Sequence, residues 1–236
     1  MAGGDIEGKE YPDGSRYLGQ MKDGKPHGRG ELWGSDGRID YKGDWFDGYR
    51  DGRGVGYGIH GELLYDGNWM GGMRHGIGIL YDSFGHHIGQ FQFDKKHGKG
   101  TILFYDREET EQPPAEIECH RIYGWWRDGQ MHGNFTGVWC DGKTYSELEF
   151  KEGRINGYGW KAMIPWEPNG PGYRGFYKDG KWHGQGASTE RDGSRIEGEY
   201  NRGYSHGLMT RYNADGTIFG KGEYDMGKFI GGDDIA

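Results

Sequence analysis

The chain has 236 residues, of which 50 are glycine, and a formal net charge of −8 at pH 7. A uniformly acidic chain is a poor candidate for binding nucleic acid or anionic membranes, because both attract basic surfaces. Apolar residues make up only 33% of the chain but aromatic residues reach 15%. Disordered chains are poor in aromatic residues, so the composition predicts a folded chain that buries its rings in a thin core.

The first predicted elements are a leading half repeat over residues 6–14 and a repeat array over about 14–104. The clearest copy reads Tyr65-Asp-Gly67-Asn-Trp69-Met-Gly-Gly72-Met-Arg-His75-Gly76-Ile-Gly78. We call the place of His75 the reference position. Across the chain it falls in nine copies at His27, Asp51, His75, His97, His132, Asn156, His183, His206 and Ile230. A fixed period of this kind indicates a repeat architecture.

Each copy predicts one β-hairpin. In Tyr65-Asp-Gly67-Asn-Trp69, alternate residues share a face, so one face carries the rings and glycine and the other is polar. Asp-Gly follows in many copies, as in Lys22-Asp23-Gly24, and this pair favours the positive φ of tight hairpins. The predicted fold is therefore all-β, an elongated single-layer antiparallel meander of about nine hairpins in one array over residues 1–236.

Two insertions interrupt the later repeats, which are expected over about 119–160 and 172–231. Residues 106–118 are acidic and contain proline, which predicts a loop. It is either a solvated insertion or an acidic contact for a basic partner. Residues 162–172 form a proline-rich loop with Met163, Ile164 and Trp166. These side chains either fold back onto the sheet or form an exposed anchor, since Trp is enriched at interface hot spots.

The repeat phrase resembles the MORN (membrane occupation and recognition nexus) repeat family over nearly the whole chain. Some copies depart from it, with His87, Ile122, Ser146 and Gly220 at the first aromatic place. The resemblance implies a scaffold of cytoskeletal, ciliary or membrane-associated assemblies. It also implies extended homodimers.

We expect the partner to be a protein helix or extended peptide. A trough of Trp and Tyr is a surface that binds such segments; alternatively, the rings pack on each other as the core, and both can hold. The candidate residues are Tyr17, Tyr41, Trp45, Tyr65, Trp69, Phe91, Trp126, Phe150, Tyr173, Tyr177 and Tyr200.

Self-association is expected at the C-terminal edge, because an uncovered edge strand invites pairing. The candidate residues there are Phe219, Tyr224 and Phe229. The second hypothesis is a peripheral membrane adaptor that binds phospholipid. The third is an enzyme subunit or a small-molecule binder.

The sequence shows no catalytic, metal or cofactor site. Six of ten histidines share the reference position, whereas a catalytic histidine is normally unique; we expect these residues to hydrogen-bond the turn backbone. Successive copies lie about 10 Å apart, too far to share one zinc ion. Glycine pairs such as Gly52-x-Gly54 open strands rather than helices, so they are not phosphate-binding loops. We expect a non-enzyme without cofactor or metal.

The expected location is cytoplasmic, at the cytoskeleton, a cilium or a membrane-proximal structure. The opening Met-Ala-Gly-Gly-Asp lacks the apolar core of a signal peptide. No stretch approaches the roughly 20 apolar residues of a transmembrane helix. Two cysteines, Cys119 and Cys140, suit a reducing compartment better than a disulfide framework.

Overall fold

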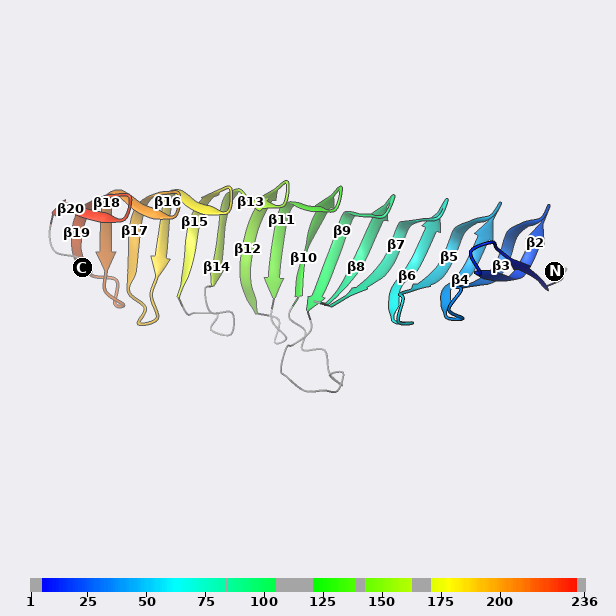
Figure 1. Ribbon diagram of the computed structural model, residues 1–236. Helices are drawn as coiled ribbons and strands as arrows, with labels where there is room; N and C mark the ends of the chain where they lie inside the picture. Colours follow the sequence, from blue (N-terminus) through cyan, green and yellow to red (C-terminus); the bar gives the residue numbers. More distant parts are fainter. Residues whose placement is uncertain (1–5, 84, 105–120, 139–142, 163–170, 233–236) are drawn as a thin grey trace. The chain divides into compact units, whose positions relative to one another are not determined.

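The computed structural model describes residues 6–83, 85–104, 121–138, 143–162 and 171–232, which form strands and turns without a helix (Figure 1). They belong to two compact units, Met1–Ile117 and Glu118–Ala236. The predicted all-β antiparallel meander of hairpins is confirmed. A single array over 1–236 remains a prediction.

Unit 1 is a sheet in which each strand pairs antiparallel with the next. Strand β1 lies along β2, as the half repeat predicts. The strands are β1 (Ile6–Glu10), β2 (Arg16–Lys22), β3 (Lys25–Trp33), β4 (Ile39–Phe46), β5 (Tyr49–Tyr57), β6 (Leu63–Met70), β7 (Met73–Asp82), β8 (Gly85–Gln92) and β9 (Lys95–Phe104).

Unit 2 continues the same pattern, except that β12 pairs with both the short β13 and the following β14. Its strands are β10 (Arg121–Arg127), β11 (Gln130–Val138), β12 (Thr144–Lys151), β13 (Arg154–Ile155), β14 (Gly157–Ala162), β15 (Gly172–Lys178), β16 (Lys181–Thr189), β17 (Arg195–Asn201), β18 (Tyr204–Tyr212), β19 (Ile218–Asp225) and β20 (Lys228–Gly232).

Tight turns join the strands of each hairpin where Asp-Gly predicts them. Between β2 and β3, Asp23 and Gly24 have φ values of 51° and 73°. Two consecutive residues with positive φ are typical of the hairpin turns that favour Asp-Gly. Neighbouring turns are also linked, because the Gly48 amide donates a hydrogen bond to the Pro26 carbonyl oxygen at 2.9 Å. The turn prediction is confirmed.

An aromatic ring lies over a glycine pair in the regular repeats. A Cβ on Gly54 would lie 2.1 Å from the Tyr41 hydroxyl oxygen and 2.4 Å from ring atom Cζ, so the ring needs glycine beneath it. The Tyr41 hydroxyl donates to the Asp44 carbonyl oxygen at 2.9 Å. The same bond recurs as Tyr17 to Gln20 at 2.7 Å, Tyr65 to Asn68 at 3.1 Å and Tyr173 to Phe176 at 3.2 Å.

Rings of successive repeats meet edge to face. The Trp69 ring centroid lies 5.3 Å from that of Tyr41 and 5.2 Å from that of Tyr65, with interplanar angles of 86° and 87°. Such pairs contribute about 0.5–1.5 kcal/mol beyond the area they bury. The tryptophan Nε1 also donates to the Gly54 carbonyl oxygen at 3.0 Å. The core of a unit is thus a ladder of rings along one face of its sheet.

In two copies of unit 2 the first aromatic residue is missing, and another side chain fills the core space that its ring would occupy. Ile122 and Ile196 occupy that place, and the glycine three residues after the reference position is replaced by Phe135 and Met209. Phe135 is buried, and its ring lies where a Cβ on Gly124 would fall. A large side chain on one strand therefore replaces the ring lost from the other. This exchange explains why irregular copies keep the fold.

The sixth copy also keeps its ring, one residue earlier than the sequence pattern places it. Ser146 stands at the aromatic place, but Tyr145 is buried and its ring lies 2.4 Å from a Cβ on Gly137. The pairing of β11 with β12 shifts register between Gly137 and Val138. This bulge allows Tyr145 to occupy the tyrosine site.

His87 takes the tyrosine place in the fourth copy, and it is only 1% exposed. Burial, with a smaller contribution from the Lys96 charge, lowers the pKa of His87 to about 3. Histidine in an unfolded chain titrates near 6.5. Above pH 6.5 the histidine is neutral in both the folded and the unfolded chain, so it does not reduce the free energy of unfolding. As the pH drops from 6.5 toward 3, the unfolded chain binds a proton that the folded chain does not, and the free energy of unfolding falls. The slope for one group reaches about 1.4 kcal/mol per pH unit.

We therefore expect His87→Tyr to flatten the acid limb of the stability profile between pH 6.5 and 3. Urea unfolding across this range measures the effect. His60→Tyr, on an exposed turn, is the matched control and should keep the wild-type profile. Superimposable profiles for wild type and His87→Tyr would contradict the assignment.

Candidate interaction surfaces

The rings predicted to line a partner-binding trough lie in the core. Ten of the eleven are buried, with exposed fractions of 0–9%, and Phe150 is partly buried. The expectation of an exposed trough of rings is wrong, and the alternative holds, in which the rings pack on each other as the core. Tyr41, for example, lies over Gly43 and Gly54 and contacts the Trp69 ring of the next repeat. Partner binding that depends on these residues remains a prediction. The buried set is Tyr17, Tyr41, Trp45, Tyr65, Trp69, Phe91, Trp126, Tyr173, Tyr177 and Tyr200.

Burial also affects the ionisation of the tyrosines. Desolvation raises the pKa of Tyr17 and Tyr65 to about 12. Their hydroxyls therefore stay protonated at neutral pH and remain donors to the backbone. This chemistry is structural.

The structure describes only some of the other predicted contact residues, which are those of the loop anchor and of the C-terminal edge. Met163, Ile164 and Trp166 lie outside the described residues, as does the acidic insertion 106–118. At the C-terminal edge, Phe219 and Phe229 are exposed and Tyr224 is partly buried. Strand β20 pairs with β19, so its other edge is unpaired within the described part of the chain.

Hydrogen bonds from the reference position to the next turn are seen in two copies without histidine, and in a third copy His206 Nδ1 lies 3.4 Å from an Asp225 carboxylate oxygen. The Asp51 carboxylate accepts a hydrogen bond from the Gly71 amide at 3.0 Å, and Asn156 Oδ1 accepts one from the Asp179 amide at 3.2 Å. His75 instead packs its ring 5.1 Å from that of Phe93. Its buried Nδ1 bonds no described residue. The prediction that the histidine hydrogen-bonds the turn backbone is thus wrong for Nδ1 of His75, because the Phe93 ring lies beside the imidazole.

A groove that the trough prediction missed lies on the opposite face of unit 1. It has a volume of about 750 Å³ and runs across strands β1 to β6. Leu18 and Val55 alternate along their strands with residues of the buried face, so their side chains point to this side. Both line the groove together with Ile6. Apolar residues at outward strand positions were the signal available in the sequence.

The floor of the groove includes the backbone of Gly30 and Gly54. The Cβ positions of both glycines point to the ring face, so neither position places a side chain on the groove side. Charged residues form the rims, where Lys42 lies 2.8 Å from Glu31 and Arg53 lies 2.7 Å from Asp66. The groove is thus apolar at its centre and bordered by paired charges.

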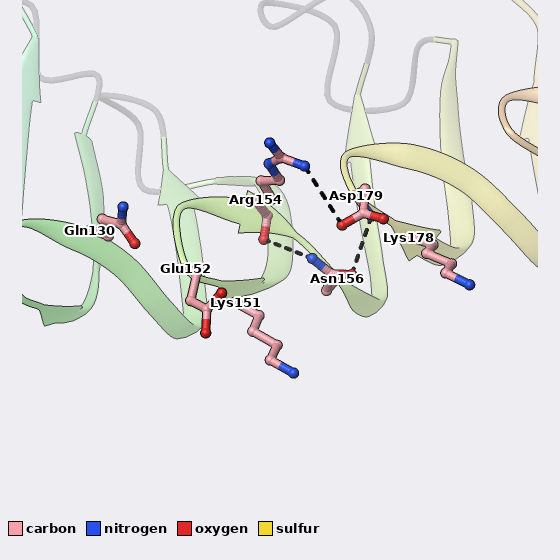
Figure 2. A pocket seen from close by; sticks show the side chains of 7 residues that line it. All are labelled: Gln130, Lys151, Glu152, Arg154, Asn156, Lys178 and Asp179. Carbon is pink, nitrogen blue, oxygen red and sulfur yellow. Dashed lines mark hydrogen bonds and ion pairs between the residues drawn. The ribbon is translucent and has the colours of Figure 1, made fainter.

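A second, polar hollow of about 470 Å³ lies at the tight turns of unit 2 (Figure 2). Arg154 lies 4.0 Å from an Asp179 carboxylate oxygen, and Asn156 bonds the Asp179 amide. Figure 2 shows the Lys151 and Lys178 amino groups extending away from this ion pair. The two lysines are therefore available to an anion.

The described residues contain no cluster of three or more His, Cys, Asp or Glu that would hold a metal ion. They also contain no helix long and apolar enough to cross a membrane.

The fold and its surfaces define a β-hairpin repeat protein with a ring ladder on one face and a groove on the other. The MORN repeat model matches six segments, residues 17–37, 41–55, 65–83, 87–108, 149–161 and 173–195. The chain therefore belongs to the MORN repeat proteins. The copies with Ile122, Ile196 and Gly220 lie outside the matched segments, in line with their missing aromatic residue. MORN repeats form a non-enzymatic repeat family associated with protein interaction and membrane-proximal proteins.

Among curated proteins, the chain is similar to Alsin. It is 37% identical over 90 residues to Alsin of Mus musculus, and 37% identical over 93 residues to Alsin of Pan troglodytes and of Homo sapiens. The aligned part is 36% of this chain and spans only 5% of the length of Alsin. The likeness is thus confined to a small part of those proteins.

Proposed function

We propose that this chain is a non-catalytic protein-interaction scaffold that binds a helix or an extended peptide along the groove side of its sheet. The observation that carries this proposal is the groove of about 750 Å³ in unit 1, with Leu18 and Val55 on its walls. Peptide-binding sites combine such an apolar centre with a charged rim. The resemblance to scaffolds of cytoskeletal, ciliary or membrane-associated assemblies supports the same role.

The introduction of charge into the groove tests this proposal. Leu18→Glu with Val55→Glu places two carboxylates where an apolar partner segment would lie; Leu18 is exposed and Val55 is half-buried in the groove. The partner is first identified by crosslinking native extract to a chain with a photoreactive residue at position 55. We expect the purified partner to bind the double variant at least tenfold more weakly. Undiminished binding by a folded double variant would exclude the groove.

The control changes two exposed apolar residues outside the groove. Phe46 and Tyr49 lie at the tight turn between β4 and β5 and are about as exposed as each other, at 61% and 60%. Phe46→Glu with Tyr49→Glu should leave partner affinity unchanged. Circular dichroism of both double variants should match that of the wild type.

A second candidate function, a peripheral membrane adaptor, is favoured by the polar hollow of unit 2. Lys151, Arg154 and Lys178 line it, and neither lysine forms an ion pair with another residue in the described ranges. Phosphate is the ligand that clustered Lys and Arg recognise. We expect any vesicle binding to depend on Lys151 and Lys178. In a flotation assay with phosphoinositide vesicles, Lys151→Gln with Lys178→Gln should abolish binding, and the absence of binding by the wild type would dismiss this function.

Self-association is also proposed, through the edge of β20 that pairs with no strand in the described part of the chain. Phe219 and Phe229 are exposed near this edge, and an unpaired strand can add a strand from a second copy. Light scattering of the full chain should give a molar mass equal to that of two chains. A chain ending after Tyr212 should be monomeric. If both proteins contained the same number of chains per particle, β20 would not be the dimer interface.

A further inference from the structure

One row of side chains on the groove side has opposite character in the two units. We define the outer row as the residues seven before and two after each reference position. Cross-strand pairing places these residues side by side, as Arg29 with Asp44 and Gln185 with Glu199. In unit 1 the row consists of Gln20, Arg29, Asp44, Arg53, Asn68, Ile77, Gln90 and Lys99.

The unit 1 row contains three cations and one carboxylate, and most of its polar groups are engaged. The Gln20 side chain accepts a hydrogen bond from the Arg29 amide at 2.7 Å, and Asp44 accepts one from the Arg53 amide at 3.0 Å. These bonds satisfy the backbone at the bulge of each hairpin. The row in unit 1 therefore serves the fold.

The unit 2 row contains three carboxylates and no cation. Its members are Trp125, Asn134, Glu149, Tyr158, Phe176, Gln185, Glu199, Leu208, Glu223 and Gly232. Trp125, Tyr158, Phe176 and Leu208 are 48–64% exposed. No hydrogen bond or ion pair joins the Glu149, Glu199 or Glu223 carboxylate to any residue in the described part of the chain. The three glutamates thus leave charge, and Tyr158, Phe176 and Leu208 leave apolar area, on the surface of the described part of unit 2.

A hollow of about 390 Å³ lies at one part of this surface. Glu147, Tyr158 and Trp160 line it, and the Tyr158 ring contacts that of Phe176 edge to face at 5.3 Å. Exposed aromatic faces attract the guanidinium or ammonium groups of Arg and Lys. The hollow is therefore suited to one long cationic side chain.

From these observations we infer that the outer row of unit 2 binds a basic amphipathic helix of a partner protein. Strands lie about 4.8 Å apart, so Glu149 on β12 and Glu223 on β19 are separated by six spacings, or about 29 Å. A helix of about 20 residues has this length. Glu199 lies two spacings from Glu223, about 10 Å, which is the rise of two helical turns. Cations at intervals of about seven residues would meet the carboxylates, and apolar residues between them would cover Tyr158, Phe176 and Leu208.

This inference rests on the proposed scaffold function and assigns a class of partner to one part of the surface. Its test uses a fluorescent 20-residue Lys/Leu peptide with an amphipathic helical pattern. A Glu/Leu peptide of the same pattern is the probe of opposite charge. Fluorescence anisotropy with the full chain measures both.

We expect the Lys/Leu peptide to bind and the Glu/Leu peptide to bind at least tenfold more weakly. The triple variant Glu149→Gln, Glu199→Gln and Glu223→Gln should lose at least tenfold in affinity for the Lys/Leu peptide. Phe176→Ser with Leu208→Ser should also weaken binding. The matched control, Glu7→Gln, Glu10→Gln and Glu190→Gln, removes the same charge elsewhere and should change affinity less than twofold.

Equal losses in the two triple variants would overturn the inference, since they would show a response to net charge alone. Equal affinity for the two peptides would also overturn it. Neither result affects the unit 1 groove, which the variants at Leu18 and Val55 test separately. If those variants lost partner binding but the peptide test failed, the scaffold function would be supported and the basic amphipathic helix would be excluded as the partner of unit 2.

Discussion

Replacing Gly54 by alanine should lower the free energy of unfolding by about 3 kcal/mol, at the upper end of overpacking effects. The added methyl group would lie 2.1 Å from the Tyr41 hydroxyl oxygen and 2.4 Å from Cζ. The ring must move, and its hydroxyl would lose the bond to the Asp44 carbonyl oxygen. Urea unfolding followed by tryptophan fluorescence measures the change.

Gly8→Ala is the matched control for this prediction. Its added methyl group would meet only the Tyr17 carbonyl oxygen, at 4.0 Å. A surface change of this kind is usually within about 0.5 kcal/mol. If Gly54→Ala were as stable as Gly8→Ala, the ring would not depend on the glycine pair, and the account of the core would be incorrect.

Trp69→Ala should cost about 3–5 kcal/mol, as expected for deletion of a buried large aromatic side chain. The change removes the edge-to-face contacts with Tyr41 and Tyr65 and the bond from Nε1 to the Gly54 carbonyl oxygen. Because the ring joins two repeats, its loss should weaken their interface. Thermal and urea unfolding of the full chain measure the effect.

Phe176→Ala provides the contrast, since this ring is 48% exposed on the opposite face. Its removal should cost only about 1 kcal/mol, because about half of the ring already lies in water and that half contributes no burial to lose. The pair of variants separates core rings from surface rings. Small, equal losses in both would indicate that Trp69 is available to a partner.

Because the rings are buried, variants that test partner binding belong on the groove side of the sheet and not on the ring face. A variant such as Trp69→Ala would reduce binding through unfolding, and it would be mistaken for a contact mutation. Leu18 and Val55 line the groove without taking part in the ring ladder. Variants at these positions therefore test binding while the core remains intact.

Much of the fold could be predicted from sequence because each repeat encodes its hairpin locally. Asp23-Gly24 specifies a turn, and the alternation from Tyr65 to Trp69 specifies a strand with one buried face. The regular spacing extends these local rules along the array. Where a copy departs from the phrase, the local rules fail, and Tyr145 and Phe135 were not recognised as core residues. Both positions depend on register and packing across strands.

The sequence by itself determined that the chain is a MORN-type array of hairpins with a ring face and a polar face. Only the tertiary structure decided that the rings are inaccessible and that the groove lies on the other side. The physical reason is that ring burial depends on the next repeat and on the glycine pair of the facing strand. Likewise, whether Glu149 and Glu199 are paired depends on the register of the neighbouring strands, and the folded sheet places no partner for either carboxylate among the described residues.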